Sequence, residues 1–172
     1  MSGLPEPVPC MIDPMTKPLL TLCLAFLMAG PASLSAQTAK GSAVDPVFKD
    51  LIRQYYEAWN SANTDKPAPL YAKDAGLVFY DLTPLKYTGW DEYKQGVQKY
   101  FFDNMASGTL TPKDDLQATR KGNIAWTTVT GHLSAKMKDG KAMEMDFRHT
   151  AIWEKRGGKW LMVHEHVSAP LQ

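Results

Sequence analysis

The C-terminal segment places two histidines and a glutamate next to each other, and these residue types can transfer protons or bind a metal ion. His164, Glu165 and His166 lie in an apolar run that follows Gly157-Gly158, a pair typical of a tight hairpin turn. Residues two apart on a β-strand point to the same face. His164 and His166 therefore share one face of the predicted strand, and Glu165 points to the other.

The alternation of apolar residues predicts which face of each strand is buried. In residues 143–153 the more apolar face consists of Met143, Met145, Phe147, His149, Ala151 and Trp153. In residues 161–167 it consists of Leu161, Val163, Glu165 and Val167. These faces should line the core, which places Arg148, His164 and His166 on the outer face unless a β-bulge reverses the pattern locally.

Three acidic or basic side chains are the catalytic candidates. His149 and Glu165, on neighbouring strands, could form an acid/base pair in which each tunes the pKa of the other, or a buried pair that only fixes the sheet. Asp81 could act as a general base with a pKa raised by burial if it shares the pocket face. The alternative role for Asp81 is that of a turn or cap residue.

The two histidines at 164 and 166 also permit a metal site. Two histidines at this spacing on a strand can bind one zinc ion if a neighbouring strand supplies a third ligand, here Asp146 or Glu144. No third ligand is well placed in the sequence, so a polar network on the outer face with Arg148 is the favoured interpretation. We therefore predict neither a metal nor a cofactor.

The elements that must position these side chains follow from periodicity and turn residues. An apolar stripe at helical spacing begins after Asp45-Pro46 and ends near Asn60, and a capping-box pattern at Thr88–Asp91 opens another helix that runs to about residue 102. We further predict a short helix at residues 67–73. Five strands are expected at residues 76–80, 114–120, 123–136, 142–155 and 159–168. Helices first and hairpin-linked strands afterwards indicate an α+β domain with an antiparallel sheet.

The N-terminal part of the chain reads as an export signal. Lys17, an uncharged apolar run at residues 19–28 and then small residues follow the order of a secretory signal peptide, with cleavage near Ala36. We predict a signal peptide at residues 1–36 (with translation starting at Met1 or at Met15), a tether at 37–44 and one domain at 45–170. Both cysteines of the chain lie before residue 37, so the exported domain would need no disulfide. The expected location is the periplasm or the extracellular medium.

The charge of the chain bounds its partners. The formal net charge is +1, and we find no basic patch with interleaved aromatic residues. So small a charge gives no reason to expect a nucleic acid or, after signal cleavage, a membrane surface as a partner.

Several motifs resemble those of one superfamily. Residues 55–60 (Tyr-Tyr-Glu-Ala-Trp-Asn) and 70–75 (Leu-Tyr-Ala-Lys-Asp-Ala) resemble the opening of nuclear transport factor 2-like domains. This superfamily includes ketosteroid isomerases, SnoaL-like proteins and the association (hub) domain of calcium/calmodulin-dependent protein kinase II. Asp81, Gly89-Trp90 and the ending at 158–168 are most similar to the SnoaL-like and hub branches, and the resemblance spans residues 45–170.

The resemblance implies a cone-shaped fold, in which a curved antiparallel sheet wraps around N-terminal helices and a pocket lies between them. It also implies a homodimer formed through the convex face of the sheet. Tyr55 matches the helix position where ketosteroid isomerases place an oxyanion-hole tyrosine, but the position of their catalytic carboxylate aligns with Phe79, which argues against steroid isomerisation. The pocket arginines of the hub align with Ala151 and Val167, so the anion pocket of the hub is not expected.

We therefore expect an exported SnoaL-like domain that binds a small, largely apolar molecule in its cone. The domain could also convert this molecule by acid/base chemistry of an isomerase or lyase type. The sequence leaves open whether the protein is an enzyme. The alternative is a non-catalytic association module similar to the kinase hub. Two sets of residues are candidates: Asp81, His149 and Glu165 for catalysis, and Tyr55, Trp90, Arg148, His164 and His166 for substrate contact, with the latter two histidines facing either the pocket or the convex interface.

Overall fold

The computed structural model describes residues 43–171, so the predicted signal peptide and most of the predicted tether lie outside the described residues. The elements are α1 (Pro46–Asn60), a 3₁₀ turn (Ala68–Leu70), β1 (Val78–Tyr80), β2 (Tyr87–Thr88), α2 (Gly89–Val97), a π-helical turn (Gln98–Phe102), β3 (Met105–Pro112), β4 (Gln117–Lys121), β5 (Ile124–Met137), β6 (Ala142–Arg156) and β7 (Lys159–Ser168). None of the helices within 43–171 is long and apolar enough to span a membrane.

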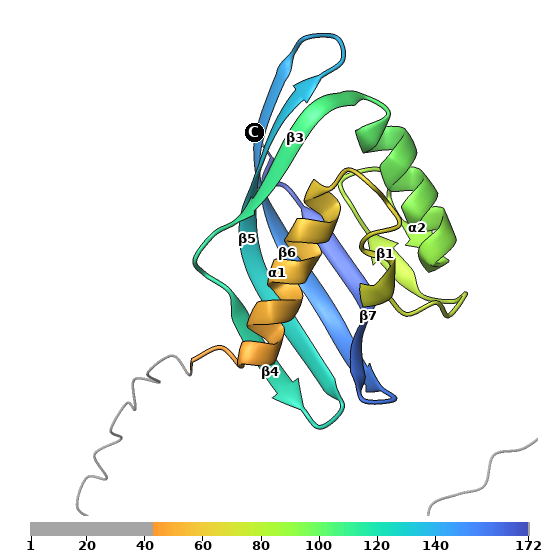
Figure 1. The fold of residues 1–172 in the computed structure, drawn as a ribbon, viewed down its shortest axis with the longest axis vertical. Coiled ribbons are helices and arrows are strands. Elements are labelled where there is room, and N and C mark those ends of the chain that lie inside the picture. Colours follow the sequence, from red (N-terminus) through yellow and green to blue (C-terminus); the bar gives the residue numbers. More distant parts are fainter. Residues whose placement is uncertain (1–42, 172) are drawn as a thin grey trace, which may run out of the picture. The chain divides into compact units, whose positions relative to one another are not determined.

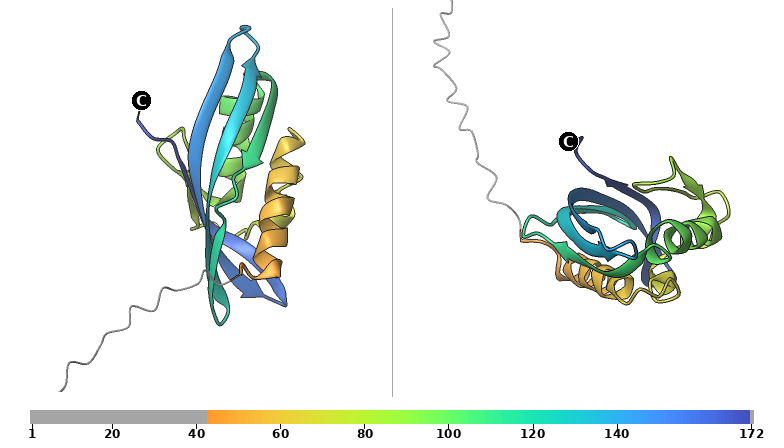
Figure 2. Two further views of the ribbon diagram at one scale, coloured as in Figure 1. Left: turned by 90° about the vertical axis from the view of Figure 1, so that its left-hand side faces the viewer. Right: turned by 90° about the horizontal axis from the view of Figure 1, so that it is seen from above.

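The strands form one curved, open sheet that carries both helices on its inner face. The strand order is β2-β1-β7-β6-β5-β3, and β4 also pairs with β5. Helix α1 crosses β5, β6 and β7 diagonally, and α2 lies beside β1, near the β2-β1 edge of the sheet (Figure 1). The view from above shows the long strands curling around the space next to the helices (Figure 2). The predicted α+β class is confirmed, although β1 pairs with β7 in parallel rather than antiparallel orientation.

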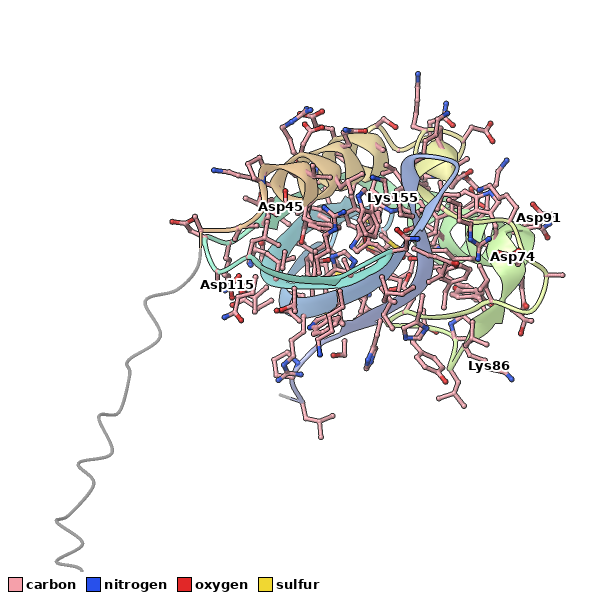
Figure 3. The ribbon with its side chains drawn as sticks, turned by 90° about the horizontal axis from the view of Figure 1, so that it is seen from below. Asp45, Asp74, Lys86, Asp91, Asp115 and Lys155 are labelled. Carbon is pink, nitrogen blue, oxygen red and sulfur yellow. The ribbon has the colours of Figure 1, made fainter. Side chains whose placement is uncertain are left out.

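Helix α1 forms as its sequence predicts and supplies most of the inner aromatic surface. Asp45 lies at the start of α1 (Figure 3) and accepts a hydrogen bond from the backbone N–H of Val47 at 3.0 Å, and Pro46 occupies the first turn. The apolar stripe is buried against the sheet through Phe48, Ile52, Tyr55, Tyr56 and Trp59. Burying one such side chain contributes about 1.5–3 kcal/mol, so this face holds α1 firmly on the sheet.

The predicted third helix is present, but its capping differs from the prediction. Thr88 makes no side-chain cap, and its backbone N–H instead donates to Glu92 at 2.7 Å, so Glu92 rather than Asp91 closes this end. At the other end the helix widens into the π-helical turn, where the N–H of Asp103 donates to the carbonyl oxygen of Gln98 at 2.8 Å.

The edge of the sheet beside β5 is the part that the sequence analysis missed. Strands β3 and β4 lie end to end along β5, with β3 paired to residues 131–137 and β4 to residues 124–128. We predicted a strand at 114–120 and none at 105–112. The break between the two lies at Asp115, which accepts hydrogen bonds from the N–H and hydroxyl of Thr130 at 2.9 and 2.7 Å. Asn60, at the end of α1, bonds both the N–H and the carbonyl of Leu110 and so fixes the outer edge of β3.

A β-bulge in β7 corrects the predicted faces of that strand. His164 pairs with Ile152, but the next pair is Met162 with Trp153, which leaves Val163 as the extra residue. Beyond the bulge the faces exchange, so Met162 is fully buried and Leu161 is only half-buried. The predicted inner placement of Leu161 and Val163 was therefore wrong, whereas that of residues 165 and 167 was right.

Candidate functional site

A fully buried glutamate stands at the centre of the inner face. The carboxylate of Glu165 accepts a hydrogen bond from Tyr55 on one oxygen and from Tyr71 on the other, both at 2.5 Å. Tyr55 comes from α1, whereas Tyr71 follows the 3₁₀ turn and bridges β7 at Met162. The N–H of Ala72 donates to the carbonyl oxygen of Met162 at 2.9 Å, which docks this segment on the free edge of β7. One loop and one helix thus converge on a single strand residue.

Burial shapes the protonation of this group. Burial alone would raise the pKa of Glu165, but the nearby imidazole of His149 and the hydrogen bonds from the two phenols lower it by more. Burial, followed by the negative charge of Glu165, raises the pKa of Tyr55 and of Tyr71 well above the usual value. Both phenols therefore remain protonated and act as donors to a carboxylate.

His149 lies beside this carboxylate, as predicted. Its Nε2 is 3.2 Å from Oε1 of Glu165, and both side chains are completely buried. Its ring stacks on Tyr55 with the centroids 4.5 Å apart and the planes 16° from parallel. Neither ring nitrogen has an aligned hydrogen bond within residues 43–171, so stacking and the proximity of the carboxylate hold the ring. The predicted His149–Glu165 pair is present, but it lies beneath the pocket instead of lining it.

A chain of polar groups connects the buried glutamate to the pocket. The indole N–H of Trp59 donates to the hydroxyl of Tyr71 at 3.2 Å. Interaction with the hydroxyl of Tyr93, on α2, lowers the pKa of Tyr71 and of Asp81. Tyr93 therefore stands between the buried Glu165 network and Asp81.

The pocket itself lies between the helices and the inner face of the sheet. It has a volume of about 90 Å³ and is mostly apolar. Its polar lining comes from Tyr55, Asn60, Asp81 and Tyr93, and its apolar walls are Trp59, Leu82, Val97, Phe101, Phe102, Met105, Gly108, Leu110, Leu133, Met145, Phe147 and Val167.

Two local features shape the pocket walls. The π-helical turn carries Phe101 and Phe102, which are half-buried and form one side of the pocket. Phe147, another wall residue, places the tip of its ring against Gly131 in β5, where a Cβ atom would come within 2.4 Å of the ring. A larger residue at 131 would push Phe147 into the pocket.

Asp81 has the most unusual chemistry of the lining residues. It follows β1 and lines the pocket, which is the condition under which it could act as a base. Burial first, and then the negative charge of Glu165, raises the pKa of Asp81 to about 7, although hydrogen bonds from Leu82 and Tyr93 lower it in part. The N–H of Leu82 donates to its Oδ1 at 2.7 Å. A carboxyl group with such a pKa can accept or donate a proton at neutral pH.

The other predicted contact residues lie elsewhere. Trp90 is buried behind the pocket, where it packs on Tyr71 with centroids 4.4 Å apart and is covered by the ammonium of Lys73. Arg148 and His166 are exposed on the outer face, and His164 beside them places Nδ1 2.7 Å from the carbonyl oxygen of Val78. None of these four residues lines the pocket.

Several site residues were not among the predicted candidates. Tyr71 and Tyr93 complete the polar chain, and Phe101, Phe102 and Asn60 line the pocket. Their types gave a partial signal, because aromatic residues recur on the faces of the short helices. Nothing local in the sequence indicates that Tyr71 docks on β7, about ninety residues later in the chain.

A second cluster of charged residues lies on the outer face. His132 has Nδ1 2.7 Å from Asp146 and Nε2 2.8 Å from Glu144, and Ser134 donates to the same glutamate at 2.8 Å. These two acidic residues were expected only as possible zinc ligands beside His164 and His166. Within the described part of the chain no group of three or more His, Cys, Asp or Glu side chains has the arrangement of a metal site.

The family model for the SnoaL-like domain matches residues 49–172. The chain belongs to the SnoaL-like domain family. A search of curated protein sequences found no match.

Solved structures agree with this assignment at the level of the fold. The SnoaL-like domain is similar to a nuclear transport factor 2-like protein of Salmonella enterica, with 20% identity, a TM-score of 0.67 and coverage of 73% of this chain and 89% of that one. It is also similar to a protein of Xanthomonas campestris named as a calcium/calmodulin-dependent protein kinase II association domain, with 19% identity, a TM-score of 0.63 and coverage of 77% and 95%. A Shewanella frigidimarina protein named as a ketosteroid isomerase gives 24% identity, a TM-score of 0.61 and coverage of 73% and 98%. These likenesses confirm the predicted fold.

Proposed function

We propose that this SnoaL-like domain binds a small, largely apolar molecule in its pocket and can exchange a proton with it through Asp81. The observation that carries the proposal is the position of Asp81, which is the one ionisable acid or base among the residues that line the pocket, apart from its two tyrosines. A carboxyl group whose pKa is raised to about 7 is half ionised near neutral pH, as general acid/base catalysis requires.

The buried residues would support this role indirectly. Glu165 and His149 lie beneath the pocket, and the charge of Glu165 contributes to the raised pKa of Asp81. In the proposed mechanism Glu165 is a positioning residue, which holds Tyr55 and Tyr71 and tunes Asp81. Tyr55 cannot act as the oxyanion donor of a ketosteroid isomerase while its proton is bonded to Glu165.

A thermal-shift screen with a broad metabolite panel tests the proposal. We expect one chemical class to raise the melting temperature of the wild type and to lose this effect in Asp81→Asn or in Gly131→Leu, in which Phe147 would fill the pocket. If no compound in the panel stabilises the wild-type protein, the proposal fails.

We also propose that a second copy of the chain covers the outer face of the sheet. Ile124, Trp126 and Tyr80 are exposed large side chains there, and the similar Xanthomonas campestris protein is named as an association domain. Light scattering tests this: we expect a dimer for the wild type and a monomer for Trp126→Lys. A monomeric wild type would contradict the dimer, and a ring of ten or more subunits would favour an association module.

Export is part of the proposal as well. The apolar run at 19–28 supports removal of residues 1–36 and a periplasmic or secreted location. N-terminal sequencing of the protein from the medium or periplasm should begin near residue 37, whereas an uncleaved cytoplasmic chain would contradict export.

A further inference from the structure

We propose that the ligand of this pocket is a compact primary ammonium ion, whose charged group lies against Asp81 and whose apolar body lies among the aromatic walls. The inference rests on the proposed ligand-binding function and names the chemical class of the ligand.

The first argument is the charge of the pocket. Asp81 takes part in no salt bridge within the described residues, and the lining contains no Lys, Arg or His. A carboxylate in an apolar cavity costs free energy unless a positive charge compensates it. A ligand that carries this positive charge would supply the missing partner, whereas an anionic ligand would be repelled.

The second argument is that several donors of the pocket lining are already used. Tyr55 donates its proton to Glu165, and the side-chain amide of Asn60 donates one N–H to the carbonyl of Leu110 and accepts from its backbone N–H. The backbone N–H of Leu82 donates to Asp81 itself. What remains open toward the cavity is acceptor capacity on the Asp81 carboxylate and on the phenol oxygen of Tyr55. The three N–H groups of an ammonium match these acceptors, whereas a ketone could use only the hydroxyl of Tyr93, the second N–H of Asn60 or a protonated Asp81.

The third argument is the composition of the walls. Six aromatic rings line a pocket of about 90 Å³: Tyr55, Trp59, Tyr93, Phe101, Phe102 and Phe147. Aromatic faces attract cations, by about 0.5–2 kcal/mol per contact, and cages of such faces are a recurring means of binding ammonium groups. Pockets that hold drug-sized ligands measure roughly 300–1,000 Å³, so the ligand must be compact.

Three probes with one carbon skeleton test the inference: cyclopentylamine, cyclopentanol and cyclopentanone. Each is titrated into the full mature domain, and binding is followed by the NMR resonance of the Trp59 indole N–H. At about pH 8.5, where the Asp81 carboxyl is ionised, we expect the amine to bind at least ~10-fold more tightly than the alcohol, with the ketone weakest. Asp81→Asn should bring the amine and the alcohol within about 2-fold of each other. Asp146→Asn, which removes the same charge from the outer face, should leave the preference unchanged.

The wild type alone provides a second test if Asp81→Asn fails to fold. The amine should bind about 10-fold more weakly for each pH unit below 7, because protonation removes the carboxylate, and the affinity for the alcohol should not follow this trend. An amine that does not bind, or binds no better than the alcohol, overturns the inference. If the alcohol or the ketone then binds in the pocket, the proposed small-molecule function survives without the ammonium assignment. If none of the three probes and no compound of the metabolite panel binds, both proposals fail.

Discussion

The domain contains two histidine–carboxylate groups that differ mainly in burial. On the inner face His149 lies 3.2 Å from Glu165, and neither side chain is exposed. On the outer face His132 lies 2.7 Å from Asp146 and 2.8 Å from Glu144, and the three side chains are 42%, 53% and 57% exposed. The outer contacts are closer and better aligned, yet we expect the inner group to matter far more for stability.

The two groups differ because water can replace the partners of exposed side chains but not those of buried ones. When an outer partner is removed, solvent satisfies the remaining groups and screens the remaining charges. When Glu165 is removed, two phenols and an imidazole are left without partners in a dry interior. Burial, rather than contact distance, therefore determines how much a charged cluster contributes to the stability of this fold.

The largest expected effect is the loss of the central carboxylate. We expect Glu165→Ala to lower the free energy of unfolding by about 3–5 kcal/mol, because a buried partner of several polar groups is removed. Urea unfolding at neutral pH measures it. Glu144→Ala is the matched control, and its unfolding curve should overlay that of the wild type. Equal effects of the two substitutions would contradict the comparison.

The next effect concerns the two phenols that donate to Glu165. Tyr55→Phe and Tyr71→Phe should each lower the free energy of unfolding by about 1–3 kcal/mol, because each removes a buried hydrogen bond to a charged group. Tyr100→Phe, at a half-exposed position in the π-helical turn, is the control and should be neutral. The account would be wrong about these hydrogen bonds if all three variants unfolded at the same denaturant concentration.

A smaller effect should appear in the pH dependence of stability. The pKa of Asp81 is raised from 3.8 to about 7 in the folded state, so the folded state binds more protons than the unfolded state between these values. Stability from this group is therefore highest below pH 3.8 and falls as the pH rises to 7. Because the side chain is partly open to the pocket, we expect Asp81→Asn to gain about 2 kcal/mol over the wild type across this interval. Parallel pH profiles for the two proteins would refute the assignment.

The smallest effect is the titration of the outer histidine. Hydrogen bonds to Asp146 and then Glu144 raise the pKa of His132 above 6.5, so its stabilising contribution is present below that pH and is lost as the pH rises through the raised value. Proton NMR of the histidine rings should show His132 titrating at a higher pH in the wild type than in Asp146→Asn, and the difference should shrink in high salt. An unchanged titration midpoint would show that these contacts are not made in solution.

Much of the fold follows from local sequence patterns. The Asp45-Pro46 start of α1 and the glycine-containing turns at 122, 140 and 157–158 are all present, because positive backbone φ at these glycines is the conformation that tight turns require. Strand β3 was missed because residues 105–112 lack apolar alternation. Its position depends on β5 and on the clamp from Asn60, which are contacts distant in sequence.

The site was predictable only in part, for a similar reason. Parity correctly brought His149 and Glu165 inward, since both follow a strict two-residue period. The bulge at Val163 has no local signal, because Leu161 and Met162 are equally apolar. The positions of Tyr71 and Tyr93 come from three-dimensional packing, which the sequence does not show. The sequence therefore identified Asp81 as a catalytic candidate, but it could not show that Asp81 lines the pocket while His149 and Glu165 do not.

In the proposed function Asp81, and not the buried Glu165, exchanges protons with the ligand in the pocket. Carbon-13 NMR of the side-chain carboxyl groups across a pH titration tests it most directly, with Asp81→Asn used to assign the resonance. We expect Asp81 to titrate at about 7 and Glu165 to show a lowered pKa. An Asp81 resonance that titrates near the ordinary value of 3.8 would overturn the proposed role of Asp81.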